Sequence, residues 1–287
     1  MEYPAFEESY LRSVVQRFLK HKLAVTGLVI IVIMALLAIF APIIAPMDPN
    51  KVTSSFEAAP SSEYWLGTDQ IGRDVLSRLI YATRVSLMVG AGSVVIGISI
   101  GTIMGLLSGY FGGWVDMLIM RVTDVFMSFP QLMLILVVVS VVGPGLMNVI
   151  LVLGFLGWTG SARLVRGNTL SLKQMDYVKA GVALGLSTPR ILFVHILPNT
   201  IAPILVNATF WIAGAITTEA ALSFLGLGVR PPTASWGNML TEAQSLTVLT
   251  SQPWLWIPAG LMIVIAVLAV NFIGDGLRDA VDPKSLK

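Results

Sequence analysis

The sequence predicts an all-α membrane protein with six transmembrane helices, and three observations lead to this prediction. Of its 287 residues, 55% are hydrophobic and only 12% are charged, and the mean hydropathy is +0.82. That composition holds more apolar surface than one soluble core of this size hides. Long uncharged runs also recur along the chain, each close to or above the roughly 20 residues that cross a bilayer.

Six such runs are expected to span the membrane, which places both termini on the same side. The first apolar run follows a polar N-terminal segment at 1–22. The two together are longer than a cleavable signal peptide, so we expect this run to be retained as a span. A turn signal at Gly143-Pro144-Gly145 divides the longest run. In chain order the expected spans are 23–47, 85–115, the two parts of 125–162, 200–228 and 253–274.

The domain organisation follows from these spans. An N-terminal tail at 1–22 and the first span precede an external loop at 48–84, a core of five spans fills 85–275, and a C-terminal tail closes the chain at 276–287. The external loop is expected to hold a helix lying in the membrane interface at 73–85, where apolar and charged residues fall on opposite helical faces.

The distribution of basic residues predicts the orientation. Twelve Lys and Arg fall in the two tails and in the loop at 163–199, whereas five fall in the loops on the other side. Basic residues concentrate on the cytoplasmic flanks of spans. We therefore expect both termini and the loop at 163–199 to be cytoplasmic, in the inner membrane of a bacterium.

A stripe of glycines in the second expected span indicates close helix packing. Gly97, Gly101, Gly105 and Gly109 recur at four-residue spacing, and Gly113 continues the series. In lipid, such a bare stripe lets another helix approach and gain dispersion contacts. A role in helix sliding during a transport cycle is the alternative reading.

Charged residues inside spans are costly and are therefore candidates for a transport pathway. Arg121 and Asp124 lie three residues apart on one helical face, which favours an internal ion pair over a contact with substrate. Glu219 has no basic residue nearby in the sequence, so it must find a partner on another helix, stay protonated or face water. We expect it either in a core or lining a polar cavity.

Several kinds of chemistry have no sequence signal here. The chain has no cysteine and two widely separated histidines, so no metal site is expected. It has no Gly-Lys dipeptide and hence no P-loop for a nucleotide, and no hydrolase motif. The net charge of +2 is too small to indicate nucleic acid as a partner. We predict a non-catalytic protein without a cofactor, whose energy comes from an ion gradient or from other subunits.

The polar, interrupted stretch at 175–199 is the expected site of contact with such subunits. Met175, Val178 and Val182 recur at helical spacing, and Gly185 is placed to end that helix. A second short helix is expected from Thr188 as N-cap and Pro189 at its first position. An apolar stripe on a polar helix is typical of insertion into another protein's groove, while resting on the lipid surface is the alternative.

This stretch resembles the cytoplasmic "EAA" loop of permease subunits of ATP-binding-cassette (ABC) importers. In that family Glu-Ala-Ala precedes three residues, a Gly and, about nine residues later, Ile-x-Leu-Pro. Lys179-Ala180-Gly181, Gly185 and Ile196-Leu197-Pro198 occupy these positions here. The Glu and the second Ala are replaced, so the contact made by the family's Glu differs at Lys179.

Four further stretches are similar to the second permease of dipeptide, oligopeptide and nickel importers. They are WLGTDQIGRDVLSRLIYATRVSL at 65–87, RVTDVFMSFP at 121–130, TEAALSFLGLGVRPPTASWGNML at 218–240 and FIGDGLRDAVDP at 272–283. Together with the EAA-like loop they cover most of the chain after residue 60.

The resemblance implies the type I ABC importer permease fold and a set of partners. These are a second homologous permease, two cytoplasmic ATPases that hold ATP and Mg, an external substrate-binding protein, and the lipid bilayer. It also implies that a coupling helix contacts the ATPases through Met175, Asp176, Tyr177, Val178, Lys179, Ala180, Gly181, Val182, Gly185, Pro189 and Arg190.

Alternatives remain open for the energy source and the substrate. An ion-gradient-driven secondary transporter or channel would use Asp124 and Glu219 as ion sites. Peptides are the expected substrate, but nickel or another small solute would leave the same motifs.

Overall fold

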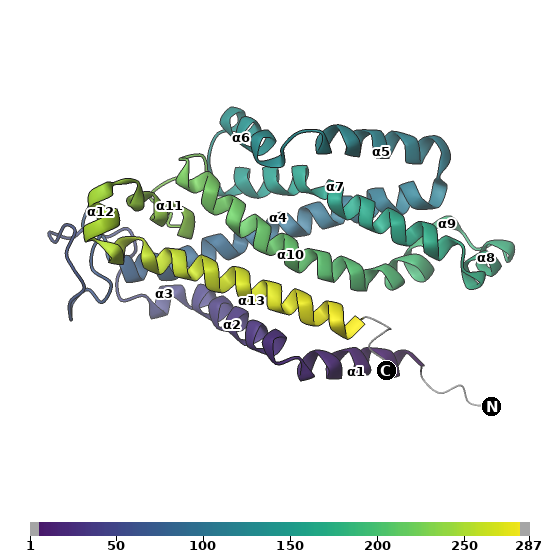
Figure 1. The fold of residues 1–287 in the computed structure, drawn as a ribbon, viewed down its shortest axis with the longest axis horizontal. Helices are drawn as coiled ribbons and strands as arrows, with labels where there is room; N and C mark the ends of the chain where they lie inside the picture. The colour runs from purple at the N-terminus through teal and green to yellow at the C-terminus, as the bar shows by residue number, and fades with distance from the viewer. Residues whose placement is uncertain (1–5, 282–287) are drawn as a thin grey trace.

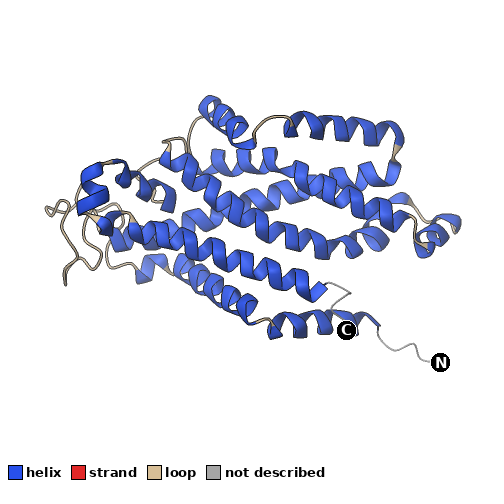
Figure 2. Ribbon diagram, viewed as in Figure 1, coloured by secondary structure: helices blue, strands red, loops and turns tan. Residues whose placement is uncertain are grey.

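The computed structural model describes residues 6–281, and helices are its regular elements (Figure 2). In chain order they are α1 (Phe6–Lys20), α2 (Lys22–Ile39), α3 (Ala41–Ile44), α4 (Val75–Phe111), α5 (Gly113–Met127), α6 (Gln131–Val142), α7 (Leu146–Lys173), α8 (Asp176–Ala183), α9 (Thr188–Arg190), a π-helical turn (Ile191–Ile196), α10 (Leu197–Phe224), α11 (Trp236–Leu240), a 3₁₀ turn (Thr241–Gln244), α12 (Leu246–Ser251), a 3₁₀ turn (Pro253–Leu255) and α13 (Ile257–Val281). The predicted all-helical class is confirmed.

The long helices form a bundle whose two ends differ (Figure 1). α4, α7 and α10 lie in the middle, α5 and α6 run along one edge, and α2 and α13 run along the other. α4 packs mainly on α7, α10 on α13, and α13 on α2. α8 projects at the end near α1, whereas α11, α12 and the loop before α4 gather at the opposite end.

Within residues 6–281, five helical segments are long and apolar enough to cross a membrane, and there are six if the bent pair of α5 and α6 counts as one span. These two helices are bent by 86° at the short break between them. Pro130 lies at the break, where it lacks an amide donor and disfavours helical backbone at Phe129. The third expected span, the first part of 125–162, therefore corresponds to a bent pair of helices with a break at 128–130.

The prediction of a separate interfacial helix at 73–85 is wrong. It forms the first turns of α4, which runs without interruption for 37 residues after the N-cap Asp74. Part of the charged face of the pattern is covered by the loop before α4: Arg78 is 5% exposed, and its Nε lies 3.5 Å from the Asp69 carboxylate, whereas Arg84 is exposed. A helix with a buried charged face and one lying in the interface have the same periodicity in sequence.

The ends of the bundle differ from the predicted tails. The N-terminal tail is helical from Phe6 and nearly continuous with α2, because only His21 separates them. α13 continues to Val281, so the predicted boundary at 276 falls inside a helix. Lys284 and Lys287, two of the basic residues used for orientation, lie outside the described residues.

Candidate functional site

The short helix α8 owes its shape to Gly185. This residue has φ +77°, a left-handed conformation that L side chains rarely adopt. The amide of Leu186 donates to the Gly181 carbonyl and that of Gly185 to the Val182 carbonyl, both at 3.0 Å. This pair of bonds is the Schellman motif that ends a helix. The chain therefore turns back toward the bundle directly after α8.

The side chains of α8 divide into one anchor and an exposed apolar set. Val178 is only 1% exposed and packs in a cluster with Leu106, Val165 and Ile191 from α4, α7 and the π-helical turn. The exposed apolar residues of α8 and its flanks are Met175 (49%), Tyr177 (45%), Val182 (53%) and Leu184 (83%). The sequence predicted an exposed stripe of Met175, Val178 and Val182; this prediction is wrong for Val178, which is buried. Sequence reasoning missed Leu184, because it follows the last helical turn.

The return from α8 is one long helix and not a second short one. α9 begins at Thr188 with Ser187 as its N-cap, one residue before the predicted cap, and Pro189 falls at the second helical position. Helical backbone continues to Phe224, 37 residues in all. The wide π-helical turn ends at Ile196, two residues before Pro198, which has no amide N–H to donate. Arg190 and the remaining polar residues of α8, Asp176 and Lys179, are exposed.

The glycine stripe is where α4 and α7 approach most closely. A Cβ at Gly101 would lie 2.6 Å from the Trp158 carbonyl oxygen, and one at Gly105 would lie 2.6 Å from that of Ala162. A Cβ at Gly109 would lie 2.7 Å from the Thr169 Cβ and 2.9 Å from the Arg166 carbonyl oxygen. Gly97 faces the Trp211 ring of α10. No larger side chain fits at these points unless the helices separate, so the stripe holds α4 against α7.

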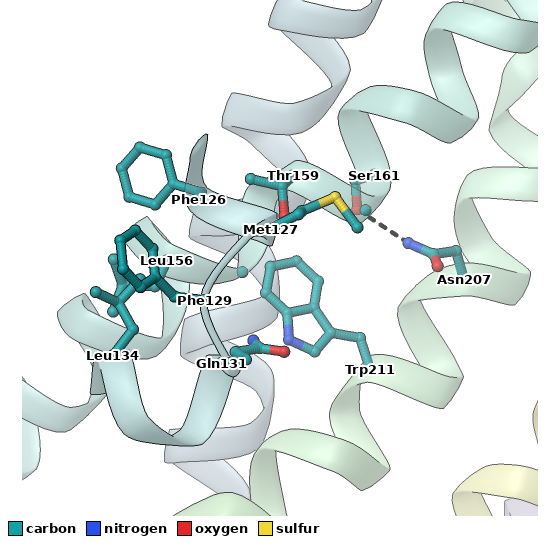
Figure 3. Close-up of a pocket in the computed structure, with 12 residues that line it drawn as sticks. Phe126, Met127, Phe129, Gln131, Leu134, Leu156, Thr159, Ser161, Asn207 and Trp211 are labelled. Carbon is teal, nitrogen blue, oxygen red and sulfur yellow. Dashed lines mark hydrogen bonds between the residues drawn. The ribbon is translucent and has the colours of Figure 1, made fainter. Parts of the chain in front are cut away.

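A cavity of about 280 Å³ lies beside the bend between α5 and α6 (Figure 3). Trp211 forms one wall and packs against Gly157 of α7 as well as Gly97. The other lining residues are aromatic, aliphatic or uncharged polar groups: Phe126, Met127, Phe129, Gln131, Leu134, Leu156, Thr159, Gly160, Ser161 and Asn207. The Asn207 amide donates to the Ser161 hydroxyl at 2.9 Å. Sequence reasoning missed this site, although amide side chains inside apolar spans are a usable signal.

The two charges expected to pair within α5 do not do so. Asp124 accepts a 2.6 Å hydrogen bond from Arg163 of α7, and both side chains are about half exposed. Asp116 forms a two-pronged ion pair with Arg166, with N–O distances of 2.6 Å. Both acids of α5 thus pair with α7. The predicted pair of Arg121 and Asp124 is wrong, because three-residue spacing reports only neighbours on the same helix.

Glu219 lies in the core and does not line the cavity. Its side chain is completely buried near the end of α10. The Ser223 hydroxyl donates to one carboxyl oxygen at 2.7 Å, and that of Ser86 on α4 lies 3.4 Å from the other. Ser86 in turn accepts the Trp236 amide of α11 at 3.1 Å. The partner that the sequence required is therefore a set of hydroxyl groups, and the expected cavity-lining role is not seen.

Comparisons with known proteins give concordant matches. Residues 97–287 match the family model of the binding-protein-dependent transport system inner membrane component, and residues 9–60 match that of the N-terminal transmembrane domain of oligopeptide transport permease C. The dipeptide transport system permease protein DppC of Alkalihalophilus pseudofirmus is 41% identical over 95% of the chain and 90% of its own length. The oligopeptide transport system permease protein OppC of Bacillus subtilis is 43% identical over 94% and 88%.

A third relative and a solved structure extend this comparison. The glutathione transport system permease protein GsiD of Pectobacterium atrosepticum is 43% identical over 94% of the chain and 89% of its own length. The solved structure is that of the MetNI methionine ABC transporter in inward-facing conformations. It superposes with a TM-score of 0.57 over 71% of the chain and 97% of the matched chain, at 18% identity. At that identity the likeness bears on the fold alone.

Proposed function

Because the chain belongs to the family of binding-protein-dependent transport system inner membrane components, we propose that it is one of two permease subunits of an ATP-driven peptide importer. It is a multi-pass inner-membrane protein with the permease fold predicted from its sequence. The relatives named above are permeases for dipeptides, oligopeptides and glutathione, which supports a peptide as the substrate.

The exposed apolar surface of α8 is the observation that carries this proposal. A short helix held by one buried valine, with Leu184 83% exposed at its tip, gains stability only when another surface covers it. We assign that surface to a cytoplasmic ATPase subunit that binds ATP and Mg, with both termini of the permease on the same side. A second ATPase serves the second permease.

The edge formed by α5 and α6 supports contact with the second permease. Apolar side chains here are strongly exposed, including Met117 (61%), Val137 (63%) and Val141 (83%). A homologous permease packed on this edge would enclose the cavity at the bend between the two subunits. The end with α11 and α12 is left to the external binding protein.

The cavity walls fit a peptide without selecting its side chains. Gln131, Thr159 and Asn207 offer amide and hydroxyl groups for backbone hydrogen bonds, and no described lining residue is charged. We propose that peptide identity is set by the binding protein and that this wall is a permissive passage. ATP-driven movement of α8 would reorient α10 and alternate the access of the cavity.

The proposal is tested by peptide uptake into proteoliposomes that contain both permeases and the ATPases. The binding protein is added on the side of the external face of the permeases. Peptide uptake should require ATP and persist when ion gradients are collapsed. Leu184→Asp should abolish uptake by placing a charge in the docking surface, whereas Leu184→Met should preserve it. Uptake that follows an ion gradient without ATP would overturn the proposal in favour of secondary transport.

A further inference from the structure

A pocket of about 370 Å³ lies beside α8, on the same end of the molecule as the exposed apolar surface. It is lined by Tyr110 at the end of α4, Lys173 and Gln174 at the end of α7, and Lys179 and Val182 of α8. Two of these five residues are cations and none is acidic. The pocket is therefore electropositive where the permease meets its ATPase.

The two lysines are held in different ways. The Lys173 ammonium donates to the Tyr110 carbonyl at 2.5 Å and lies 5.4 Å from the centre of the Tyr110 ring. These contacts fix one positive charge at the pocket wall. Lys179 is exposed, and in the described part of the chain its ammonium makes no hydrogen bond or ion pair. Asp176 lies one turn earlier but neither lines the pocket nor pairs with Lys179.

We propose that this pocket receives a carboxylate side chain of the partner ATPase, which binds between the fixed Lys173 and the free Lys179. The inference rests on the proposed function and specifies the chemistry of its docking site. A carboxylate bridging two ammonium groups makes charge-assisted hydrogen bonds, and beside the exposed apolar residues it is partly shielded from water. This contact would also select the ATPase partner, because a basic side chain in place of the carboxylate would be repelled by the two lysines.

Crosslinking identifies the partner group directly. A carbodiimide joins a lysine amine to a carboxyl group as an amide, and the water released is taken up as the urea by-product. In the assembled complex, mass spectrometry should find Lys179 linked to an Asp or Glu of the ATPase. Lys179→Arg keeps the charge but removes the reactive amine, so this variant should lose the link.

Charge reversal tests the energetic role. Lys179→Glu should weaken ATPase association by about tenfold or more, and a Lys in place of the crosslinked ATPase carboxylate should restore it. Because Lys179 is exposed, the variant should melt at the same temperature as the native permease. Unchanged association of Lys179→Glu, with Leu184→Asp still defective, would overturn the carboxylate pocket and leave the proposed function standing.

Two other results would also overturn the inference. If neither Lys179→Glu nor Leu184→Asp affects association, the proposed docking by α8 fails as well. If the Lys179→Glu defect occurs only in vesicles containing anionic phospholipid and is absent in phosphatidylcholine alone, the pocket holds a lipid headgroup and not a protein carboxylate.

Discussion

The two ends of the bundle each carry a short helix, and the two helices are built in opposite ways. α11 has five residues; its Trp236 and Met239 are at most 4% exposed, and Gly237 packs against Ala220 of α10. A capping box joins Ser235 and Asn238 at its start. α8 has eight residues, of which Val178 and Gly181 are buried, so Val178 provides its only deeply buried side chain.

This difference shows which end is complete within the chain. A helix of five to eight residues is unstable alone, so it must be held by contacts outside itself. α11 obtains them from α4, α10 and α13 of its own chain. α8 leaves most of its apolar groups uncovered within the described chain, which is consistent with the ATPase contact proposed above.

The largest expected effect on stability is at α11. Trp236→Ala should lower the free energy of unfolding by about 3–5 kcal/mol, because it leaves a cavity in the core around α11. Leu184→Ala at the uncovered end should change it by no more than about 0.5 kcal/mol. Unfolding of the purified permease in mixed micelles measures both.

Trp236→Phe is the control for the loss of volume. The Trp236 indole N–H has no acceptor in the described structure, so Phe removes no hydrogen bond and should cost less than Ala. If Leu184→Ala destabilises the isolated permease as much as Trp236→Ala, the contrast between the ends does not hold.

The next effect concerns the hydroxyl groups around Glu219. Glu219→Ala should cost about 1–3 kcal/mol, because buried hydroxyls of Ser86 and Ser223 lose their acceptor. Glu219→Gln retains an acceptor and should unfold closer to the native protein. It should also transport the same range of peptides, since the side chain lies in the core; an altered range would show that Glu219 reaches the pathway.

A smaller effect is expected at the turn after α8. Gly185→Ala should loosen α8 by about 1–2 kcal/mol, because its left-handed φ of +77° disfavours a side chain. Gly181→Ala should instead tighten it by roughly 0.5–1 kcal/mol, since the new Cβ meets only the flexible tip of Leu186 at 3.1 Å. Hydrogen exchange of the α8 amides should accelerate in the first variant and slow in the second. Equal protection in both would contradict the role of Gly185.

The smallest effect is a pH dependence at the α11 end. Burial, followed by the negative charge of Asp69, raises the pKa of Glu242 above its ordinary value of 4.5. A carboxyl with a raised folded pKa binds more protons when folded, so its contribution to stability is present below pH 4.5 and falls as the pH rises through the raised value. Glu242→Gln should flatten this part of the melting curve against pH, and an unchanged slope would assign it to another group.

Local features of the sequence predicted the helical class, five of the apolar spans, the end of α8 at Gly185 and the close helix packing of the glycine stripe. Each rests on composition, periodicity or the backbone freedom of one residue type. The bend at Pro130 had a local signal that was not used. Other features depend on contacts between distant segments: Asp124 pairs with Arg163, 39 residues away, and Val178 turns inward because α4 and α7 end beside it. Residue spacing within one helix contains no information about such partners.

The helical segment from Thr188 to Phe224, which includes the π-helical turn, has a mechanical consequence. At the usual rise per residue, its 37 residues make a rod about 55 Å long. One end adjoins the α8 turn and the other carries Glu219, so the rod acts as a lever across the whole bundle. A tilt of about 10° at the α8 end would displace the far end by about 10 Å relative to it. A small angular motion at the α8 end would therefore become a large displacement at the opposite end of the bundle.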